Sequence, residues 1–210
     1  MIYWITLCIL SCTALLYFEW KRSTSGVWLS KPMAAFAYVG AAIASEAFSS
    51  TFGVWIFVGL CLSWLGDILL IPKQNEPAFL VGIGSFLFAH VAYSIAFISL
   101  GLDLSILFPA LLIGLLVIYA ALRWLAPHLK DFFRLAVPFY VTVIVVMICC
   151  SISATSSTGN WYVALGALMF ALSDLSVAKD RLIKEDFLNR SWGLPLYFAA
   201  QFVLVGALRF

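Results

Sequence analysis

The sequence predicts an all-α integral membrane protein, a polytopic bundle of eight transmembrane helices that forms a single domain over residues 1–210. Of the 210 residues, 64% are hydrophobic and only 10% are charged, whereas soluble domains carry about 25% charged residues. This surplus of apolar surface cannot be buried in one water-soluble core, so the surrounding solvent is expected to be lipid. The spacing of the apolar segments, and of the basic residues between them, predicts the same architecture.

Long apolar segments account for nearly the whole chain. A helix needs about 20 mostly apolar residues to span a bilayer. Turn and charge signals separate the segments, most weakly at residues 101–103. The first segment lacks the basic n-region and the cleavage site of a signal peptide, so we expect it to be a retained helix. The eight segments cover approximately residues 2–18, 28–45, 52–71, 79–100, 104–125, 134–153, 160–178 and 191–209.

The basic residues predict the orientation of the bundle. Of the 12 Lys and Arg, all but Arg209 fall in the first, third, fifth and seventh breaks or in the segment ends beside them. Because Lys and Arg favour the cytoplasmic side, we expect these breaks in the cytoplasm and both termini outside it. The residues in question are Lys21, Arg22, Lys31, Lys73, Arg123, Lys130, Arg134, Lys179, Arg181, Lys184 and Arg190.

A faint internal repeat relates the third segment to the seventh. The stretch from Gly59 to Asp67 resembles the stretch from Gly166 to Asp174, with a small residue just before each aspartate. The first four segments are therefore predicted to be duplicated as the last four. Because four is an even number, the halves would be parallel repeats, which place both aspartates at one depth.

Asp67 and Asp174 are the candidate catalytic residues. A charged residue inside a spanning helix costs about 3 kcal/mol by insertion scales, so it usually faces the bundle interior or a water-filled cavity. Small residues on their helix faces would let the two aspartates face one another in the cytoplasmic half. Two neighbouring carboxyls in a low-dielectric site share a proton, which supplies an acid and a base together. The alternative is two unrelated acids that form interhelical hydrogen bonds.

The remaining acids are expected at loops, interfaces or segment ends, where they are solvated. They are Glu19, Glu46, Glu76, Asp103, Asp131, Asp180, Glu185 and Asp186.

Four further polar side chains are predicted near mid-membrane. His90 and Tyr93 lie one turn apart on the fourth segment, and Tyr197 and Gln201 lie one turn apart on the eighth. His90 is either a hydrogen-bonded core histidine or part of the site. Gln201 bonds either a catalytic group or a neighbouring helix.

Lys31 is expected to open the second helix, with Ser30 as its N-cap and Pro32 in its first turn. Three interpretations stay open for this lysine. Its side chain extends to the cytoplasmic interface, holds a lipid phosphate, or pairs with an aspartate.

The sequence lacks the motifs of several other kinds of enzyme and of nucleic-acid-binding proteins. The sequence contains no nucleophilic-serine elbow, phosphate-binding glycine loop or metalloprotease motif, and a net charge of +2 does not suggest a nucleic-acid partner. Apart from His90 the only histidine is His128, in a break, so no metal or other cofactor is expected. The five cysteines lie inside apolar segments and are interpreted as small core residues: Cys8, Cys12, Cys61, Cys149 and Cys150.

The order and spacing of these motifs resemble one known family over nearly the whole chain. That family is the group of bacterial YhhN and animal TMEM86 proteins, the lysoplasmalogenases. The motifs that carry the resemblance are Ser30-Lys31-Pro32, Ser63-Trp-Leu-Gly66-Asp67, Gly84 to Tyr93, Gly166 to Asp174, and Tyr197-x-x-x-Gln201.

The resemblance implies an eight-helix enzyme of the bacterial inner membrane, with lysophospholipid as its substrate and membrane lipids around it. It would hydrolyse the vinyl ether bond of lysoplasmalogens to a fatty aldehyde and glycerophosphoethanolamine or glycerophosphocholine. Asp67 and Asp174 would be its acid and base, in an order the motifs leave open, near the cytoplasmic side. The substrate-binding residues would be Lys31, Ser63, His90, Tyr93, Ser173, Tyr197 and Gln201.

A proton-coupled transporter of a small or lipid-like solute is the alternative, since paired intramembrane acids also serve as proton relays. Turnover by purified protein would favour the enzyme, and flux without turnover would favour the transporter. The oligomeric state and the headgroup preference do not follow from the sequence.

Overall fold

The chain folds into eight long helices and a few short helical turns. The computed structural model describes residues 1–72, 75–129 and 133–210, and these residues contain no strand. This confirms the predicted all-α bundle. The long helices are α1 (Ile2–Trp20), α2 (Thr24–Ile43), α3 (Thr51–Leu69), α4 (Glu76–Ser99), α5 (Leu104–Leu125), α6 (Phe133–Thr158), α7 (Trp161–Ala178) and α8 (Phe187–Gly206).

Polar side chains at the N-caps explain where several helices begin. Ser50 caps α3, Asn75 caps α4, and Asp186 caps α8 by accepting a hydrogen bond from the amide of Leu188. Each cap satisfies an amide that has no partner within the helix. Gly101, with φ of 88°, lies in the turn between α4 and α5, so the weakest predicted break is a real one.

The predicted start of the second helix is wrong by more than one turn. Ser23, not Ser30, caps α2, and it accepts a hydrogen bond from the amide of Gly26. Ser30 is buried inside the helix and donates to the carbonyl oxygen of Gly26. Lys31 therefore lies well inside α2, beside Pro32 in the helix interior.

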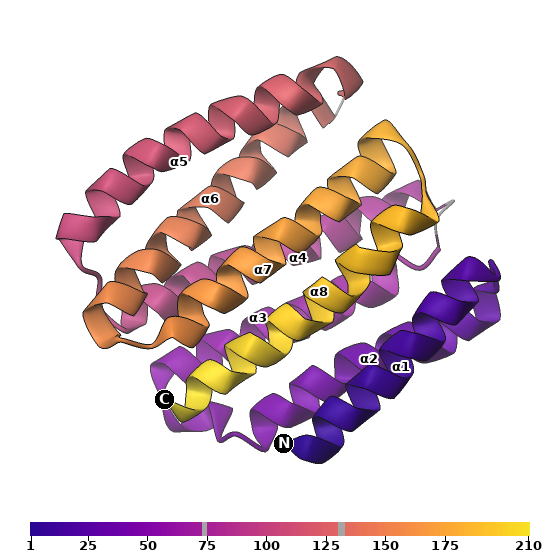
Figure 1. The fold of residues 1–210 in the computed structure, drawn as a ribbon, viewed down its shortest axis with the longest axis horizontal. Helices are drawn as coiled ribbons and strands as arrows, with labels where there is room; N and C mark the ends of the chain where they lie inside the picture. Colours follow the sequence, from indigo (N-terminus) through magenta and orange to yellow (C-terminus); the bar gives the residue numbers. More distant parts are fainter. Residues whose placement is uncertain (73–74, 130–132) are drawn as a thin grey trace.

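Consecutive helices pack as antiparallel hairpins. The pairs α1–α2, α3–α4, α5–α6 and α7–α8 form the most extensive interfaces, and α8 also contacts α1 and α2. Figure 1 shows α5 at one edge of the bundle beside α6, and the two chain termini near one another. A buried core that includes Tyr38, Tyr93 and Phe170 joins the other helices to one another; most of its members lie on α1 to α4 and on α6 to α8.

Within the described residues, seven helices are long and apolar enough to cross a membrane, which indicates an integral membrane protein. The one long helix that is not among these seven is α2. It is less apolar because it contains Lys31, two serines and many Ala and Gly residues. More than half of its residues are buried against neighbouring helices. In contrast, α5 exposes most of its large apolar side chains, as expected for a helix that faces lipid.

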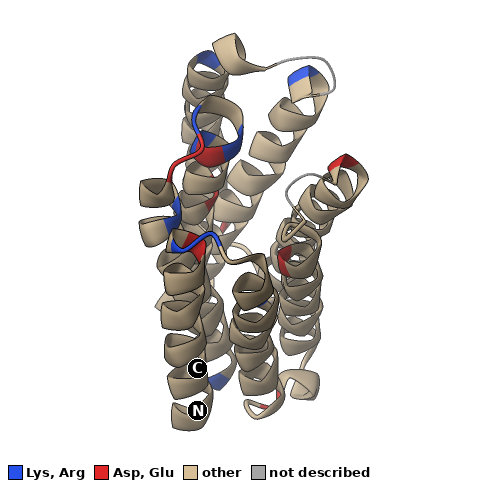
Figure 2. Ribbon diagram, turned by 90° about the vertical axis from the view of Figure 1, so that its right-hand side faces the viewer, with Lys and Arg blue, Asp and Glu red and all other residues tan. Residues whose placement is uncertain are grey.

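Most Lys and Arg positions gather toward the end of the bundle that is opposite the termini (Figure 2). This distribution fits the predicted orientation in the membrane, which stays a prediction. Lys73 and Lys130, which contributed to it, and Asp131, which was expected in a break, lie outside the described residues.

Candidate active site

A largely apolar cavity of about 790 Å³ lies within the bundle, and both predicted catalytic aspartates line it. Most of the wall comes from α4, α6 and α7, and a shorter part comes from α8. Its volume lies within the range of about 300–1,000 Å³ that is usual for small-molecule sites. The cavity therefore combines an apolar chamber with two carboxyl groups.

Asp67, on α3, is surrounded by hydrogen-bond donors. Its Oδ1 lies 3.2 Å from Nζ of Lys31. Its Oδ2 accepts hydrogen bonds from the hydroxyls of Tyr197 at 2.7 Å and Tyr38 at 3.2 Å. The two tyrosine oxygens are 3.0 Å apart. Only 2% of the Asp67 side chain is exposed, and a cation with two hydroxyl donors stabilises a buried carboxylate.

Asp174, on α7, has different partners and is more open. Its Oδ2 accepts a hydrogen bond from the hydroxyl of Tyr140 at 3.2 Å and lies 3.2 Å from Nε2 of His90. The side chain is 13% exposed, whereas that of His90 is fully buried. The His90 ring stacks on Phe170, with 4.4 Å between the ring centroids. The stacking fixes the imidazole next to the carboxyl group.

The orientation of His90 determines which nitrogen carries a proton. Its Nδ1 lies 2.7 Å from the carbonyl oxygen of Phe86, which can only accept, so Nδ1 is the donor. In a neutral imidazole, Nε2 is then a lone pair directed at Asp174. The contact is not aligned as a hydrogen bond, and Nε2 has no other partner among the described residues. The imidazole therefore presents Nε2, and not an N–H, to the carboxyl group of Asp174.

The two aspartates share a pattern of partners. Each accepts from a tyrosine on the preceding helix hairpin, Tyr38 of α2 for Asp67 and Tyr140 of α6 for Asp174, and both distances are 3.2 Å. Each also meets a side chain from the last helix of the other half, Tyr197 of α8 and His90 of α4. This pattern fits the parallel repeat predicted from the sequence, which stays a prediction.

The aspartates do not form the directly facing pair that their helix positions suggested. Among the described residues, no hydrogen bond joins the two carboxyls, and each has its own donors. The small residues do allow close helix approach, but with other partners. Gly66 packs against the Phe86 ring of α4, and Gly166 packs against Leu204 of α8. The cavity, to which both aspartates contribute, is what connects them.

Lys31 pairs with an aspartate, which was one of its three predicted interpretations. Of the other predicted binding residues, Tyr197 and Ser173 line the cavity. The Ser173 hydroxyl donates to the carbonyl oxygen of Phe170, within its own helix.

Four predicted binding residues do not line the cavity: His90, which contacts Asp174 instead, and Tyr93, Gln201 and Ser63. The hydroxyl of Tyr93 donates to Oε1 of Gln201 at 2.6 Å, and Nε2 of Gln201 lies 3.5 Å from the hydroxyl of Ser63. All three side chains are buried, and none is part of the cavity wall. Their hydrogen bonds join α4, α8 and α3. That these residues contact substrate stays a prediction.

Sequence reasoning missed Tyr38 and Tyr140. Tyr38 follows Lys31 by two helical turns, so it lies on the same face of α2, and this spacing could have identified it. Tyr140 stands two residues after Pro138 in an otherwise apolar segment, and nothing near it in the sequence indicates its partner.

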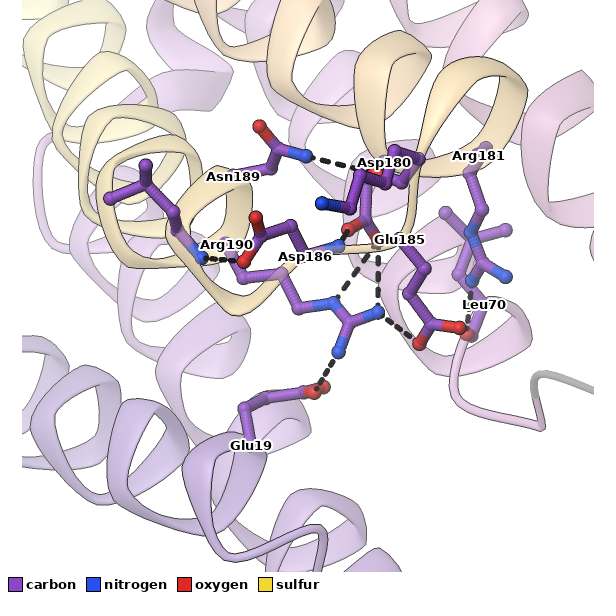
Figure 3. Close-up of polar contacts among 10 residues, drawn as sticks. Glu19, Leu70, Asp180, Arg181, Glu185, Asp186, Asn189 and Arg190 are labelled. Carbon is purple, nitrogen blue, oxygen red and sulfur yellow. Dashed lines mark hydrogen bonds and ion pairs between the residues drawn. The ribbon is translucent and has the colours of Figure 1, made fainter.

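Charged residues cluster at one end of the cavity (Figure 3). Arg190 of α8 lies 3.2 Å from Oε2 of Glu19 and 3.0 Å from Oδ2 of Asp180, and it also contacts Glu185. These contacts connect the end of α1, the π-helical turn η3 (Lys179–Ile183) and the start of α8. Three of the acids that were expected to be solvated or interfacial, Glu19, Asp180 and Glu185, therefore form ion pairs with Arg190.

Known proteins resemble the chain in sequence. A lysoplasmalogenase of Mycobacterium bovis is 31% identical over 162 residues, which are 73% of this chain and 59% of that protein. The lysoplasmalogenase TMEM86A of Bos taurus is 32% identical over 157 residues, 71% of this chain and 62% of that protein. The chain thus matches about three fifths of the length of these relatives. No solved structure matches it.

A lysoplasmalogenase homolog of Dictyostelium discoideum is 30% identical over 157 residues, which are 61% of this chain and 50% of that protein. The model of the YhhN family matches residues 26–208, a range that contains both aspartates and every residue that contacts them. On this match, the chain belongs to the YhhN family.

Proposed function

We propose that the chain is a membrane hydrolase that cleaves the vinyl ether bond of lysoplasmalogens. The products are a fatty aldehyde and glycerophosphoethanolamine or glycerophosphocholine. The names of the relatives support this substrate class. The observation that carries the proposal is that one apolar cavity holds two carboxyl groups with different partners, Lys31 and two tyrosines for Asp67, and His90 and one tyrosine for Asp174.

Vinyl ether hydrolysis needs an acid and a carboxylate in one place. The slow step is transfer of a proton to the β-carbon of the double bond, which leaves an oxocarbenium ion. A carboxylic acid that keeps its proton provides the first step, and a nearby carboxylate stabilises the cation and orients water. Pairs of carboxyls whose surroundings differ are the usual way to divide these roles.

Asp174 is proposed as the acid. Nε2 of His90 lies 3.2 Å from Oδ2 of Asp174 and is free to accept, because Nδ1 is bound to the carbonyl oxygen of Phe86. Asp174 is also the more exposed of the two carboxyls, so a ligand in the cavity can reach it. His90 does not line the cavity and acts through Asp174, which makes it a positioning residue.

Asp67 is proposed as the carboxylate. Lys31, Tyr38 and Tyr197 all donate to it, and these contacts stabilise the negative charge of its ionised form. A carboxylate is a sufficient base for this step, because water bound to an oxocarbenium ion is a strong acid. The negative charge of Asp67 also opposes the positive charge of the intermediate.

The proposed reaction balances with one water molecule. Asp174 gives its proton to the β-carbon, and the α-carbon becomes an oxocarbenium ion. Water adds to that carbon and passes a proton to Asp67, which leaves a hemiacetal. The hemiacetal loses its hydroxyl proton to Asp174 as the carbon–oxygen bond to glycerol breaks, and Asp67 returns its proton to the departing glycerol oxygen.

The membrane setting completes the proposal. We place the chain in the bacterial inner membrane with the cavity nearer the cytoplasmic side. Support comes from the Lys and Arg residues, most of which gather toward one end of the bundle (Figure 2). Because Lys and Arg favour the cytoplasmic side, we take this end as the cytoplasmic one. Asp67 and Asp174 both lie close to the C-terminal ends of their helices, α3 and α7, at the end of the cavity where the charged residues cluster.

The test is an assay of detergent-purified protein against matched alkenyl, alkyl and acyl lysophospholipids. Release of aldehyde from the alkenyl lipid alone is expected, because a saturated ether and an ester lack the double bond that accepts the proton. No release from the alkenyl lipid would overturn the proposal. A parallel measurement of proton flux in liposomes separates it from the transporter alternative, for which flux without turnover is expected.

A further inference from the structure

In the part of the chain that the structure describes, three cationic side chains line the cavity, and two of them are already paired. Lys31 lies 3.2 Å from Asp67, and Arg190 contacts three carboxylates. The third is Arg181, on η3. Among the described residues, no carboxylate lies within ion-pair distance of Arg181.

The guanidinium of Arg181 keeps most of its donors free. One Nη2 contact, to the carbonyl oxygen of Leu70, is at the limit of hydrogen bonding at 3.5 Å. The guanidinium lies 4.9 Å from the centroid of the Phe79 ring, which fixes its plane without using a donor. An arginine has five N–H donors, so this one presents a fork suited to an anion with several oxygens.

Arg181 is also at a suitable place relative to the reacting groups. Leu70, which it contacts, is one helical turn beyond Asp67, or about 4.5 Å along the axis. Figure 3 shows Arg181 beside Leu70 and near the ion pairs of Arg190. A lysophospholipid carries its phosphate on the same three-carbon glycerol as its vinyl ether. A phosphate bound at Arg181 would therefore leave the ether within reach of Asp67 and the chain in the apolar chamber.

From these contacts we propose that Arg181 binds the phosphate of the lysophospholipid and selects phosphate-bearing substrates over neutral glycerol ethers. This role takes the place of the one expected for Lys31, whose ammonium is paired with Asp67. Arg190 cannot take it, because its donors are engaged by Glu19, Asp180 and Glu185. The inference rests on the proposed function for its substrate but is tested independently of turnover.

The experiment measures binding of two lipids that cannot be hydrolysed, a 1-O-alkyl lysophosphatidylethanolamine and the corresponding 1-O-alkylglycerol. For Arg181→Gln we expect affinity for the phospholipid to fall at least tenfold, with affinity for the glycerol ether unchanged. Arg181→Lys should give an intermediate loss, because it keeps the charge and loses the fork. Lys179→Gln, an exposed residue of the same turn outside the cavity wall, should bind both lipids as the unsubstituted protein does.

Equal affinity of Arg181→Gln and the unsubstituted protein for the phospholipid would overturn the inference, even if aldehyde release confirms the hydrolase. Conversely, the expected loss of affinity would uphold Arg181 as the phosphate ligand even if no alkenyl lipid is cleaved. A third arm uses inorganic phosphate as competitor. Displacement of the lipid by phosphate at equal concentration would mean a site for free anions, and this too would overturn the assignment.

Discussion

Nε2 of His90 lies 3.2 Å from Oδ2 of Asp174, while its Nδ1 is bound to the carbonyl oxygen of Phe86. The backbone contact makes Nδ1 the proton donor, so Nε2 is the nitrogen that faces the carboxyl. Asp67 has different partners, since Lys31 and the hydroxyls of Tyr38 and Tyr197 contact it, whereas His90 and the hydroxyl of Tyr140 contact Asp174. The difference between the two aspartates is therefore set by their neighbours and not by their positions on the helices.

Replacement of His90 by phenylalanine should lower kcat by about 10–100-fold and leave KM nearly unchanged. The aromatic ring keeps its stacking on Phe170, while the nitrogen that faces Asp174 is lost. His90 is outside the cavity wall, so substrate binding should not change. Steady-state kinetics of the two proteins, with kcat and KM determined separately, check this. A large rise in KM with kcat intact would contradict the proposed role.

Tyr93→Phe should affect stability rather than chemistry. The substitution removes the hydroxyl that donates to Gln201 at 2.6 Å and leaves a buried amide oxygen without its donor, at a cost of about 1–3 kcal/mol. Because neither residue lines the cavity, KM and kcat should stay within about twofold. Thermal unfolding in detergent and kinetics on the folded fraction measure the two effects. Loss of activity without loss of stability would contradict this prediction and would indicate that Tyr93 contacts the substrate.

Gly193→Ala should disturb the contact between α7 and α8. A Cβ at this position would lie 1.8 Å from the hydroxyl oxygen of Ser176, two residues from Asp174, so the helices must shift. The expected loss of stability is about 1–3 kcal/mol, with reduced activity. Gly84→Ala is the control, because a Cβ there meets nothing within 4 Å. Similar unfolding temperatures for the two variants would contradict the described packing of α7 on α8.

Asp103, in the turn before α5, should make the stability of the folded protein depend on pH. Hydrogen bonds from Ser105 and Ser156 hold the pKa of this carboxyl below its usual value. A lowered pKa in the folded state stabilises the protein above pH about 4, and this contribution disappears as the pH falls through the folded pKa. Asp103→Ala should therefore lower the unfolding temperature by a few degrees at pH 7. The difference should narrow on acidification; a constant gap would contradict the assignment.

Much of the fold could be predicted because lipid imposes simple rules on sequence. Each spanning helix had to be long and apolar, so the helices were found to within a few residues at most ends. The start of α2 was placed too late, because Ser30-Lys31-Pro32 has the composition of a helix start but stands inside the helix. A cap depends on where the backbone turns, and Ser23 satisfies that condition while Ser30 does not.

The site was predictable in its acids and less so in their partners. Asp67 and Asp174 were identified because an acid inside an apolar helix is costly and has to be compensated. Their tyrosine partners, Tyr38 and Tyr140, come from other helices, and the sequence does not record which helices pack together. The same reason explains why Tyr93 and Gln201 were expected at the substrate but bond to one another.

The most direct test of the central proposal is aldehyde release from 1-O-alkenyl lysophosphatidylethanolamine by purified Asp67→Asn and Asp174→Asn proteins. Each variant should fall by at least 10³-fold in kcat while remaining folded, because neither amide can serve as acid or as carboxylate. Tyr93→Phe, prepared in the same way, should retain turnover as a control. Full activity in either aspartate variant would contradict the assignment of the pair as acid and carboxylate.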